Sequence, residues 1–246
     1  MNLKERVVLI TGASERIGRA IALKMASFGA VVVITYYKDE KEALNTVKMI
    51  KDYNTKGAAI KLDLNSFDEI KQVADKIVKE FGRWDILINC ASVFETVAIE
   101  NVDEFRWDTD HNIHTKGPFF LSKALYLHKK ELGKTNDGLI VNITDTQVRK
   151  PKASRPSYNL AKAALESQVK VLAVSLAPLI RVNAVAPGAI IPSGVSEIEY
   201  FNTLKEKLPL KELPTVDNIV DTVLFLIKND SITGTTVVVD SGEHLL

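Results

Sequence analysis

The chain is poor in the features that mark exported, membrane-bound and metal-binding proteins. It has one cysteine in 246 residues, Cys90, which cannot form a disulfide within the chain and is typical of a reducing compartment. No apolar run approaches the length of a membrane span, and the N-terminus leads directly into a predicted strand without the apolar core of a signal peptide. The four histidines do not form a cluster with carboxylates, so we expect no metal site. A cytoplasmic protein without membrane contact is expected.

The chain also lacks an excess of charge of either sign. It has 32 basic and 31 acidic side chains, and its formal net charge at pH 7 is +1. Because nucleic acids and anionic membranes bind strongly basic surfaces, we expect neither partner. Apolar residues, by contrast, are plentiful: they make up 46% of the chain, enough for a large buried core. The length suits a single α/β domain over residues 1–246.

Short apolar runs rich in β-branched residues alternate with longer helical stretches. Strands are predicted at 7–11, 31–35, 58–62, 86–89, 139–143, 181–185 and 236–239. Helices are predicted at 16–28, 40–53, 67–81, 102–130, 157–177 and 216–228. Continuously apolar strands that alternate with helices indicate a parallel sheet covered on both faces. We therefore predict an α/β fold with a doubly wound sheet of about seven strands, and ligands at the carboxyl ends of the strands.

The alternation is interrupted once, between residues 189 and 207. Pro192, Ser193 and Gly194 lie in this stretch, ahead of an acidic and aromatic patch. A long loop in a compact domain is more often a functional lid than a defect. We therefore expect residues 189–207 to form a lid over a substrate site.

A glycine-rich turn follows the first predicted strand, with the sequence Thr11-Gly-Ala-Ser-Glu-Arg-Ile-Gly18. Gly12 allows a tight turn, and Gly18 allows close helix packing. The helix that begins here presents free N–H groups and a positive dipole end, which suit a pyrophosphate. The alternative is a turn with glycines for geometry alone, but its place at the start of the alternation favours nucleotide binding. Arg16, where glycine would be usual, is expected to contact the pyrophosphate or the substrate.

The end of the second predicted strand indicates which dinucleotide is bound. An acidic residue at this tip would hydrogen-bond the adenosine ribose and repel a 2′-phosphate. The tip here is Tyr36, followed by Tyr37 and Lys38, and the lysine suits the phosphate. Asp39 and Glu40 weaken this argument, although acidic residues also suit the start of a helix. We predict NADPH as the cofactor, in preference to NADH.

Two further strand ends are expected to border the nucleotide. Leu62-Asp63-Leu64 ends the third strand, and Asp63 is expected to bind the adenine amino group, to cap the helix that begins near Ser66, or both. Asn89-Cys-Ala-Ser92 ends the fourth strand, where small residues let the backbone approach a flat cofactor. The alternative for this second segment is a well-packed turn.

Reaction chemistry is indicated by Tyr158 and Lys162, which lie four residues apart in a predicted helix. Residues at this spacing share one face of the helix. A phenol has an unperturbed pKa of about 10. A nearby ammonium favours the phenolate and lowers that pKa, which brings the phenol closer to proton transfer at neutral pH. Asp145 lies thirteen residues before the tyrosine. An ordinary surface role is the alternative for the pair.

These motifs, in this order, resemble the short-chain dehydrogenase/reductase family. The resemblance runs from the glycine-rich turn through the tyrosine–lysine pair and Asn183-Ala-Val-Ala-Pro-Gly188 to the C-terminal region. It implies a Rossmann-type fold, a nicotinamide cofactor, hydride transfer to a small-molecule substrate and a homotetramer. Tyr158 would donate the proton, and Lys162 would bind the nicotinamide ribose and lower the pKa of the tyrosine. The residues expected to bind the cofactor are Gly12, Ser14, Arg16, Ile17, Gly18, Tyr37, Lys38, Asp63, Leu64, Asn89, Ala91, Tyr158, Lys162, Pro187 and Gly188.

Three departures from the common family pattern resemble the pteridine reductase branch, which includes bacterial dihydromonapterin reductases. Asp145 stands where most members have a catalytic serine, Arg16 replaces a glycine, and Phe94 follows the fourth strand. In that branch the arginine contacts cofactor phosphate and substrate, the phenylalanine stacks on the pterin, and Asp, Tyr and Lys form the catalytic set. The residues expected to bind the substrate are Arg16, Ser92, Phe94, Asp145 and Tyr158.

The chemistry supports this branch independently, because reduction of a ring C=N puts a proton on nitrogen. A carboxyl group beside a phenol can relay that proton, and an aromatic face opposite the nicotinamide makes a slot for a flat heterocycle. The alternatives are that Asp145 is a structural acceptor and that Phe94 is part of the core. We expect a pteridine, such as a dihydropterin, as the substrate.

One further departure concerns His114, which takes the place of an asparagine that holds a water between the lysine and solvent in the family. Imidazole both donates and accepts, so His114 is a candidate for the same relay; the substitution could equally impair turnover. Two other functions stay open. A carbonyl reductase acting on a ketone or a 3-oxoacyl thioester would share everything except the Arg16, Phe94 and Asp145 set. A non-catalytic regulator would bind NADPH without turning it over.

Overall fold

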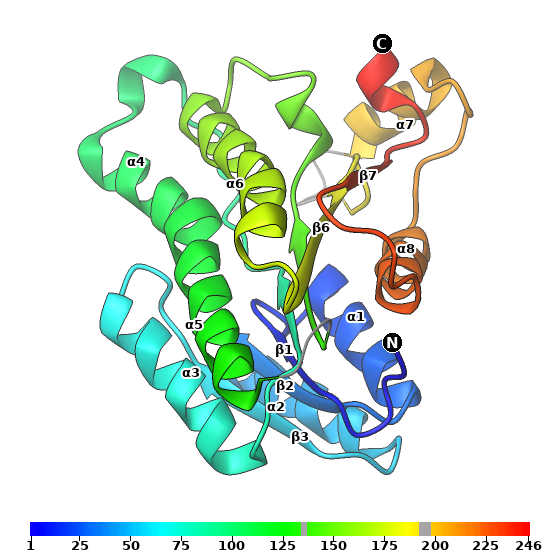
Figure 1. Ribbon diagram of the computed structural model, residues 1–246. Coiled ribbons are helices and arrows are strands. Elements are labelled where there is room, and N and C mark those ends of the chain that lie inside the picture. Colours follow the sequence, from blue (N-terminus) through cyan, green and yellow to red (C-terminus); the bar gives the residue numbers. More distant parts are fainter. Residues whose placement is uncertain (134–136, 192–197) are drawn as a thin grey trace.

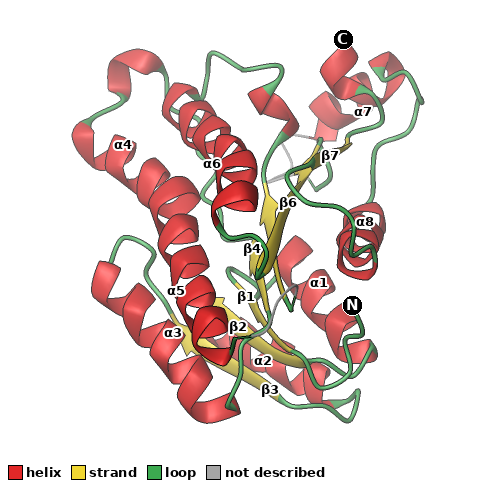
Figure 2. Ribbon diagram, viewed as in Figure 1, coloured by secondary structure: helices red, strands yellow, loops and turns green. Residues whose placement is uncertain are grey.

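The computed structural model of the protein describes residues 1–133, 137–191 and 198–246. Its centre is a sheet of seven parallel strands in the order β3-β2-β1-β4-β5-β6-β7 (Figures 1 and 2). This confirms the predicted α/β class, the doubly wound sheet and its seven strands. The strands are β1 (Val7–Ile10), β2 (Val31–Tyr36), β3 (Gly57–Lys61), β4 (Ile86–Asn89), β5 (Gly138–Ile143), β6 (Ile180–Pro187) and β7 (Thr236–Val239).

Helices lie on both faces of the sheet in a single Rossmann-type domain (Figure 2). In the described ranges, no helix combines the length and the apolar character of a membrane span. The α-helices are α1 (Arg16–Ser27), α2 (Glu40–Lys51), α3 (Phe67–Phe81), α4 (Glu104–His111), α5 (Gly117–Leu132), α6 (Pro156–Ser175), α7 (Ile198–Lys207) and α8 (Val216–Lys228).

The apolar side chains of the strands divide between two cores. In β1, Val8 and Ile10 belong to one cluster, and Val7 and Leu9 belong to the other. Helices α1, α2 and α8 cover the first face, and α3, α5 and α6 cover the second (Figure 1). Both faces of the strand are therefore buried, which explains why its sequence is apolar throughout instead of alternating with polar residues.

The prediction of one helix over residues 102–130 is wrong, because this stretch forms two helices joined by a π-helical turn. Helix α4 ends at His111, the turn spans Asn112–Lys116, and α5 begins at Gly117. Pro118 lies at the start of α5, where its missing N–H group costs least. The backbone N–H of Gly117 donates to the carbonyl of Asn112, five residues earlier. This wider turn carries His114.

Part of the stretch predicted as a lid is helical. Residues 192–197 lie outside the described residues, and residues 198–207 form α7. Phe201 and Leu204 on α7, together with Leu208 just beyond it, are buried. Their spacing is that of one helix face, and that apolar face folds the segment against the domain instead of leaving it as an extended loop.

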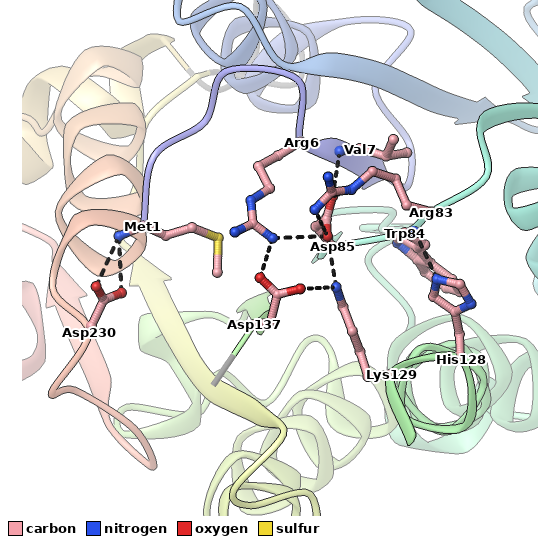
Figure 3. A network of polar contacts seen from close by, with 10 residues as sticks. All are labelled: Met1, Arg6, Val7, Arg83, Trp84, Asp85, His128, Lys129, Asp137 and Asp230. Atoms are coloured by element: carbon pink, nitrogen blue, oxygen red, sulfur yellow. Dashed lines mark hydrogen bonds and ion pairs between the residues drawn. The ribbon is translucent and has the colours of Figure 1, made fainter. Parts of the chain in front are cut away.

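A buried ion-pair cluster lies at the amino ends of the central strands. The carboxylate of Asp85, just before β4, accepts hydrogen bonds from the buried ammonium of Lys129 (2.7 Å), from Arg83 and from the backbone N–H of Val7 (Figure 3). Burial alone would raise the pKa of Asp85, but these hydrogen bonds lower it to about 2. The cluster ties helix α5 to the starts of the central strands, and its remaining members are Arg6 and Asp137.

Candidate active site

A cleft of about 1200 Å³ lies along the carboxyl ends of the strands. This is the edge at which β1 and β4 lie side by side although they are not consecutive in the chain, the position where open α/β sheets bind ligands. Most of the residues predicted to bind cofactor or substrate line it. They are Gly12, Ser14, Arg16, Ile17, Gly18, Tyr37, Lys38, Asp63, Leu64, Ala91, Ser92, Phe94, Asp145, Tyr158, Lys162, Pro187 and Gly188.

Asn89 and His114, two predicted site residues, do not line the cleft. Asn89 is buried at the end of β4 and donates a side-chain hydrogen bond of 2.8 Å to Asn142 on β5. It therefore joins two strands beneath the cleft floor instead of facing a ligand. Among the described residues, no three histidine, cysteine or carboxylate side chains lie together in a way that could hold a metal ion.

The glycine-rich turn packs closely against the end of β4. Gly12 has a φ of +64°, and a Cβ atom there would lie 2.6 Å from the Cα of Ala91. The hydroxyl of Thr11 accepts hydrogen bonds from the backbone N–H groups of Cys90 and Ala91, at 3.0 and 3.1 Å. A side chain at position 12 would push the two segments apart, so glycine is required here.

Arg16 occupies the usual glycine position in a left-handed conformation, with a φ of +53°. This backbone conformation is costly for a residue with a Cβ atom. Its guanidinium donates a 2.9 Å hydrogen bond to the carbonyl of Ile191, on the far side of the cleft after β6. The side chain therefore bridges the turn and the start of the predicted lid.

The end of β2 presents one cation to the cleft. The Tyr37 ring is half exposed, and the Lys38 ammonium lies 5.3 Å from its centroid. The neighbouring acids are engaged in structural contacts: Asp39 accepts from the Glu42 N–H at the start of α2, and Glu40 accepts from the Tyr36 hydroxyl. The acidic residues that weaken the sequence argument for a phosphate site are thus held by the helix and by Tyr36.

Asp63 does not cap the following helix, and the prediction of a cap there is wrong. Its carboxylate accepts two hydrogen bonds from Asn65, one from the backbone and one from the side-chain amide. Ser66 is the cap of α3, because its hydroxyl accepts from the N–H of Glu69. Asp63 is held at the cleft wall by its own turn.

Tyr158 and Asp145 form the shortest contact on the cleft floor. The phenol on α6 donates a 2.5 Å hydrogen bond to the carboxylate, which follows β5. A second carboxylate oxygen accepts from the N–H of Gln147 at 2.7 Å. Burial raises the pKa of Asp145, although both hydrogen bonds oppose that rise. The phenolic proton of Tyr158 therefore lies between two side chains that line the cleft.

The pKa of Tyr158 is raised, whereas the sequence argument expected Lys162 to lower it. Burial is the largest cause, and the negative charge of Asp145 adds to it. Lys162 is itself buried, and its ammonium donates to the carbonyl of Ile143 at 2.9 Å and lies 5.8 Å from the tyrosine ring. Desolvation also lowers the pKa of the lysine. In the free protein the phenol therefore stays protonated at neutral pH and can donate its proton.

His114 is buried beneath the loop that carries Phe94. Its Nδ1 lies 2.9 Å from the carbonyl of Asp110, and its Nε2 lies 3.0 Å from the hydroxyl of Ser92 and accepts from the N–H of Val93. Because Nε2 accepts, the proton is on Nδ1 and the ring is neutral. Burial, and then the charge of Lys162, hold its pKa well below the usual range. Within the described part of the chain, His114 makes no hydrogen bond to Lys162.

Phe94 contacts both Tyr158 and an arginine. Its ring lies edge-on to Tyr158 at 5.1 Å between centroids, and the guanidinium carbon of Arg155 lies 3.9 Å from the Phe94 centroid. Arg155 escaped the sequence analysis. The signal that could have found it is its place three residues before Tyr158, at the start of the same helix.

Two other cleft residues also escaped the sequence analysis. The ammonium of Lys152 donates to the Tyr200 hydroxyl at 2.6 Å, joining the loop before α6 to α7. Glu243, near the C-terminus, is buried and accepts from the backbone N–H of Ala189. A separation of 54 residues hides this second contact from any local reading of the sequence.

Comparison with known proteins gives consistent matches over nearly the whole chain. A family described as enoyl-(acyl carrier protein) reductase matches residues 12–244. NADPH-dependent aldehyde reductase 1, chloroplastic, of Arabidopsis thaliana is 35% identical over 239 residues, which cover 92% of this chain and 81% of that protein. The 3-oxoacyl-(acyl-carrier-protein) reductase FabG of Buchnera aphidicola is 30% identical over 250 residues and is covered completely, as is this chain.

A solved structure resembles the whole domain. FolM alternative dihydrofolate reductase 1 from Brucella canis, solved in complex with NADP, superimposes with a TM-score of 0.90 at 33% sequence identity. The match covers 100% of this chain and 97% of that one. That protein therefore shares the arrangement of strands and helices around the cleft.

Proposed function

Because the chain belongs to the short-chain dehydrogenase/reductase family, we propose that it is an NADPH-dependent oxidoreductase that reduces a pteridine, with Tyr158 as the proton donor. The observation that carries this proposal is the 2.5 Å hydrogen bond from Tyr158 to Asp145, next to the Phe94 ring. A carboxyl group in this position suits proton delivery to a ring nitrogen, and the partly exposed Phe94 ring suits a flat heterocycle.

The cleft fits a dinucleotide together with a substrate. Its volume of about 1200 Å³ exceeds the roughly 300–1000 Å³ of a typical small-ligand pocket. The first turn of α1 borders it with backbone N–H groups that suit a pyrophosphate, and Lys38 offers a cation for a 2′-phosphate. Asp63 would meet the adenine, and Lys162, Pro187 and Gly188 would border the nicotinamide end. When bound, NADPH supplies the hydride.

The protein's own groups supply the proton. Tyr158 gives its phenolic proton to the substrate nitrogen, and the carboxyl group of Asp145, when protonated, returns a proton to the phenolate. Burial raises the pKa of Asp145, which is the direction that such a proton relay requires. Lys162 places a positive charge near the phenolate as it forms. His114 acts as a positioning residue that orients Ser92 and the segment leading to Phe94.

We extend the proposal to the lid and to the assembly. Residues 189–207 would close over the substrate, and the Lys152–Tyr200 contact supports this because it joins α7 to the wall of the cleft. A homotetramer would form through α4, α5 and α6, where large apolar side chains are exposed. Examples of these exposed residues are Phe105, Trp107, Phe119, Val171 and Val174.

Reduction of a carbonyl is the second candidate, favoured by the names of two relatives, an aldehyde reductase and a 3-oxoacyl reductase. Tyr158 would then protonate an oxygen, and Asp145 would have no proton to relay to a ring nitrogen. The two candidates share the fold and the cofactor cleft, so the substrate alone separates them.

Steady-state oxidation of NADPH with dihydropterins, beside a panel of aldehydes, ketones and 3-oxoacyl thioesters, tests the proposal. We expect turnover of a dihydropterin. Turnover restricted to carbonyl compounds would establish the second candidate instead. NADPH binding without any turnover would indicate a regulator.

The variant Tyr158→Phe identifies the proton donor, because it removes only the hydroxyl group. We expect kcat to fall by at least about 100-fold, the contribution typical of general acid catalysis. The Kd for NADPH, measured by fluorescence titration, should stay within about twofold, because the ring and Lys162 remain in place. Full activity of the variant would exclude Tyr158 as the donor.

A further inference from the structure

Arg155 is placed to meet the substrate and not the cofactor. It lies on the cleft wall as the residue that precedes α6, and its guanidinium sits against Phe94, the ring proposed to hold the pteridine. The pyrophosphate and 2′-phosphate sites proposed above are formed by the glycine-rich turn and by Lys38, on other segments of the cleft. Arg155 thus belongs to the half of the cleft that surrounds Tyr158.

The hydrogen-bonding capacity of Arg155 is unused. A guanidinium has five N–H donors in a fixed fork. Among the described residues, none of those donors meets a protein acceptor, and Nε is buried without a hydrogen-bond partner. The contact with the Phe94 ring offsets the charge in part, but it supplies no carbonyl or carboxylate oxygen.

Two other cations of the same cleft show the opposite behaviour. Arg16 donates to the carbonyl of Ile191, and Lys152 donates to the hydroxyl of Tyr200. Outside the cleft, Arg149 is paired with the carboxylate of Glu166. Arg155 differs from these three residues because, among the described residues, no backbone carbonyl and no side chain accepts a hydrogen bond from its guanidinium. Only Nε is fully buried, and a buried donor without an acceptor is costly unless a ligand or a water molecule supplies one.

Arg155 is also close enough to act on the reacting tyrosine. Burial and then Asp145 raise the pKa of Tyr158, and the charge of Arg155 opposes that rise. A neutral ligand would leave this charge without a counterion. An anion next to Phe94 would pair with it and fill the fork with two parallel hydrogen bonds, the geometry that guanidinium adopts with carboxylates and phosphates.

We propose that Arg155 is a specificity-determining residue that binds a carboxylate or phosphate group on the substrate, away from its reacting ring. The inference rests on the proposed function in one respect, that the reacting ring is a pteridine held at Phe94. The preferred substrates are then pteridines with an acidic side chain, such as a benzoylglutamate tail or a phosphate ester. Pteridines with a neutral polyol side chain are poorer substrates.

The test compares Arg155→Met, which keeps the length of the side chain, and Arg155→Lys, which keeps its charge. Arg149→Met is the matched control, because it removes an arginine outside the cleft. Values of kcat and KM are measured with dihydrofolate, dihydroneopterin phosphate and dihydrobiopterin, which carry carboxylates, a phosphate and no acidic group respectively. The two acidic substrates distinguish the two sources of the anion.

We expect Arg155→Met to raise KM for at least one acidic substrate by about 10- to 100-fold, as for loss of a charge-assisted hydrogen bond. KM for dihydrobiopterin should rise clearly less than KM for that acidic substrate, and KM for NADPH should stay within about twofold. The KM values of Arg155→Lys should lie between those of the wild type and of Arg155→Met, because a point charge remains. KM for the acidic substrate should rise with salt in the wild type and in Arg149→Met, which both keep Arg155, and should be nearly independent of salt in Arg155→Met. Equal losses with acidic and neutral substrates, or a changed KM for NADPH, would overturn the inference.

A binding measurement separates this inference from the proposed function. Calorimetry with p-aminobenzoylglutamate and with a sugar phosphate, in the presence of NADP+, requires no turnover. Saturable binding of either anion to the wild type that is lost in Arg155→Met supports the anion site, even if no pterin is reduced. No binding of either anion, or equal binding to both proteins, overturns the anion site while leaving pterin turnover as a separate result.

Discussion

Asp145 makes Tyr158 different from a tyrosine paired only with a lysine. Burial raises the pKa of the phenol in the free protein, and the carboxylate, which accepts a 2.5 Å hydrogen bond from it, raises this pKa further. The spacing of Tyr158 and Lys162 in the sequence predicts their shared helix face, and the structure places both on α6 beside the cleft. Spacing cannot predict the direction of the pKa shift, because burial and a carboxylate from another element determine it.

At the same scale, Lys38 is expected to decide between NADPH and NADH. The variant Lys38→Glu should raise KM for NADPH and lower KM for NADH, because a carboxylate repels the 2′-phosphate and accepts from the ribose hydroxyls. We expect the ratio of kcat/KM values for the two cofactors to shift by at least about tenfold towards NADH, as for reversal of a close charge contact. Lys41→Glu, an exposed substitution of the same kind on α2, is the control. An unchanged ratio in Lys38→Glu would place the phosphate elsewhere.

At the scale of elements, the strands were predictable because their apolar runs are short, β-branched and separated by helical stretches. The break between α4 and α5 was not, because the helical pattern continues through Asn112–Lys116 and only Pro118 interrupts it. This break matters for the candidate site, because the π-helical turn places His114 beneath Ser92. Arg155, Lys152 and Glu243 were missed because their partners lie on distant elements.

The turn between β1 and α1 gives a prediction about strain. Arg16 has a φ of +53°, so Arg16→Gly should relieve the backbone while Arg16→Ala keeps the strain. Both variants lose the hydrogen bond to Ile191. We expect the glycine variant to be more stable than the alanine variant by about 1 kcal/mol, measured by thermal or urea unfolding.

Both Arg16 variants should also bind NADPH more weakly than the wild type, by a similar factor, because both lack the guanidinium. The two measurements separate the backbone from the side chain. Equal stability of the two variants would contradict a strained turn, and wild-type NADPH affinity in both would remove Arg16 from the cofactor site.

At the scale of the whole molecule, the two ends of the strands differ in function. The carboxyl ends of the strands form the cleft, and the other ends are tied to α5 by the cluster around Asp85 (Figure 3). The cleft at the carboxyl ends of the strands was predictable from its motifs. The Asp85 cluster at the other ends was not, because Lys129 and Asp85 are 44 residues apart and each resembles an ordinary surface charge in the sequence.

The Asp85 cluster predicts a loss of stability in acid. The pKa of Asp85 is about 2 in the folded protein, lowered from 3.8, so its contribution is complete above the unfolded value and is lost as pH falls from about 4 towards 2. That contribution is about 2 kcal/mol in the free energy of unfolding. Urea unfolding across this pH range measures it.

The double variant Asp85→Asn, Lys129→Met leaves neither buried charge without its partner, and its stability should depend less on pH over the same range. Asp230→Asn, which removes an exposed partner of the N-terminal ammonium, is the control and should keep the wild-type slope. An identical slope in the double variant would show that other carboxylates cause the acid sensitivity.

The central claim is that Asp145 and Tyr158 together protonate a pteridine. The most direct measurement is kcat/KM of Asp145→Ser with a dihydropterin and with a simple aldehyde or ketone, each relative to the wild type. We predict that kcat/KM falls by at least about 100-fold with the dihydropterin and by less than about tenfold with the carbonyl compound, because a serine supports carbonyl reduction but relays no proton to a ring nitrogen. Equal losses with both substrates would contradict the account.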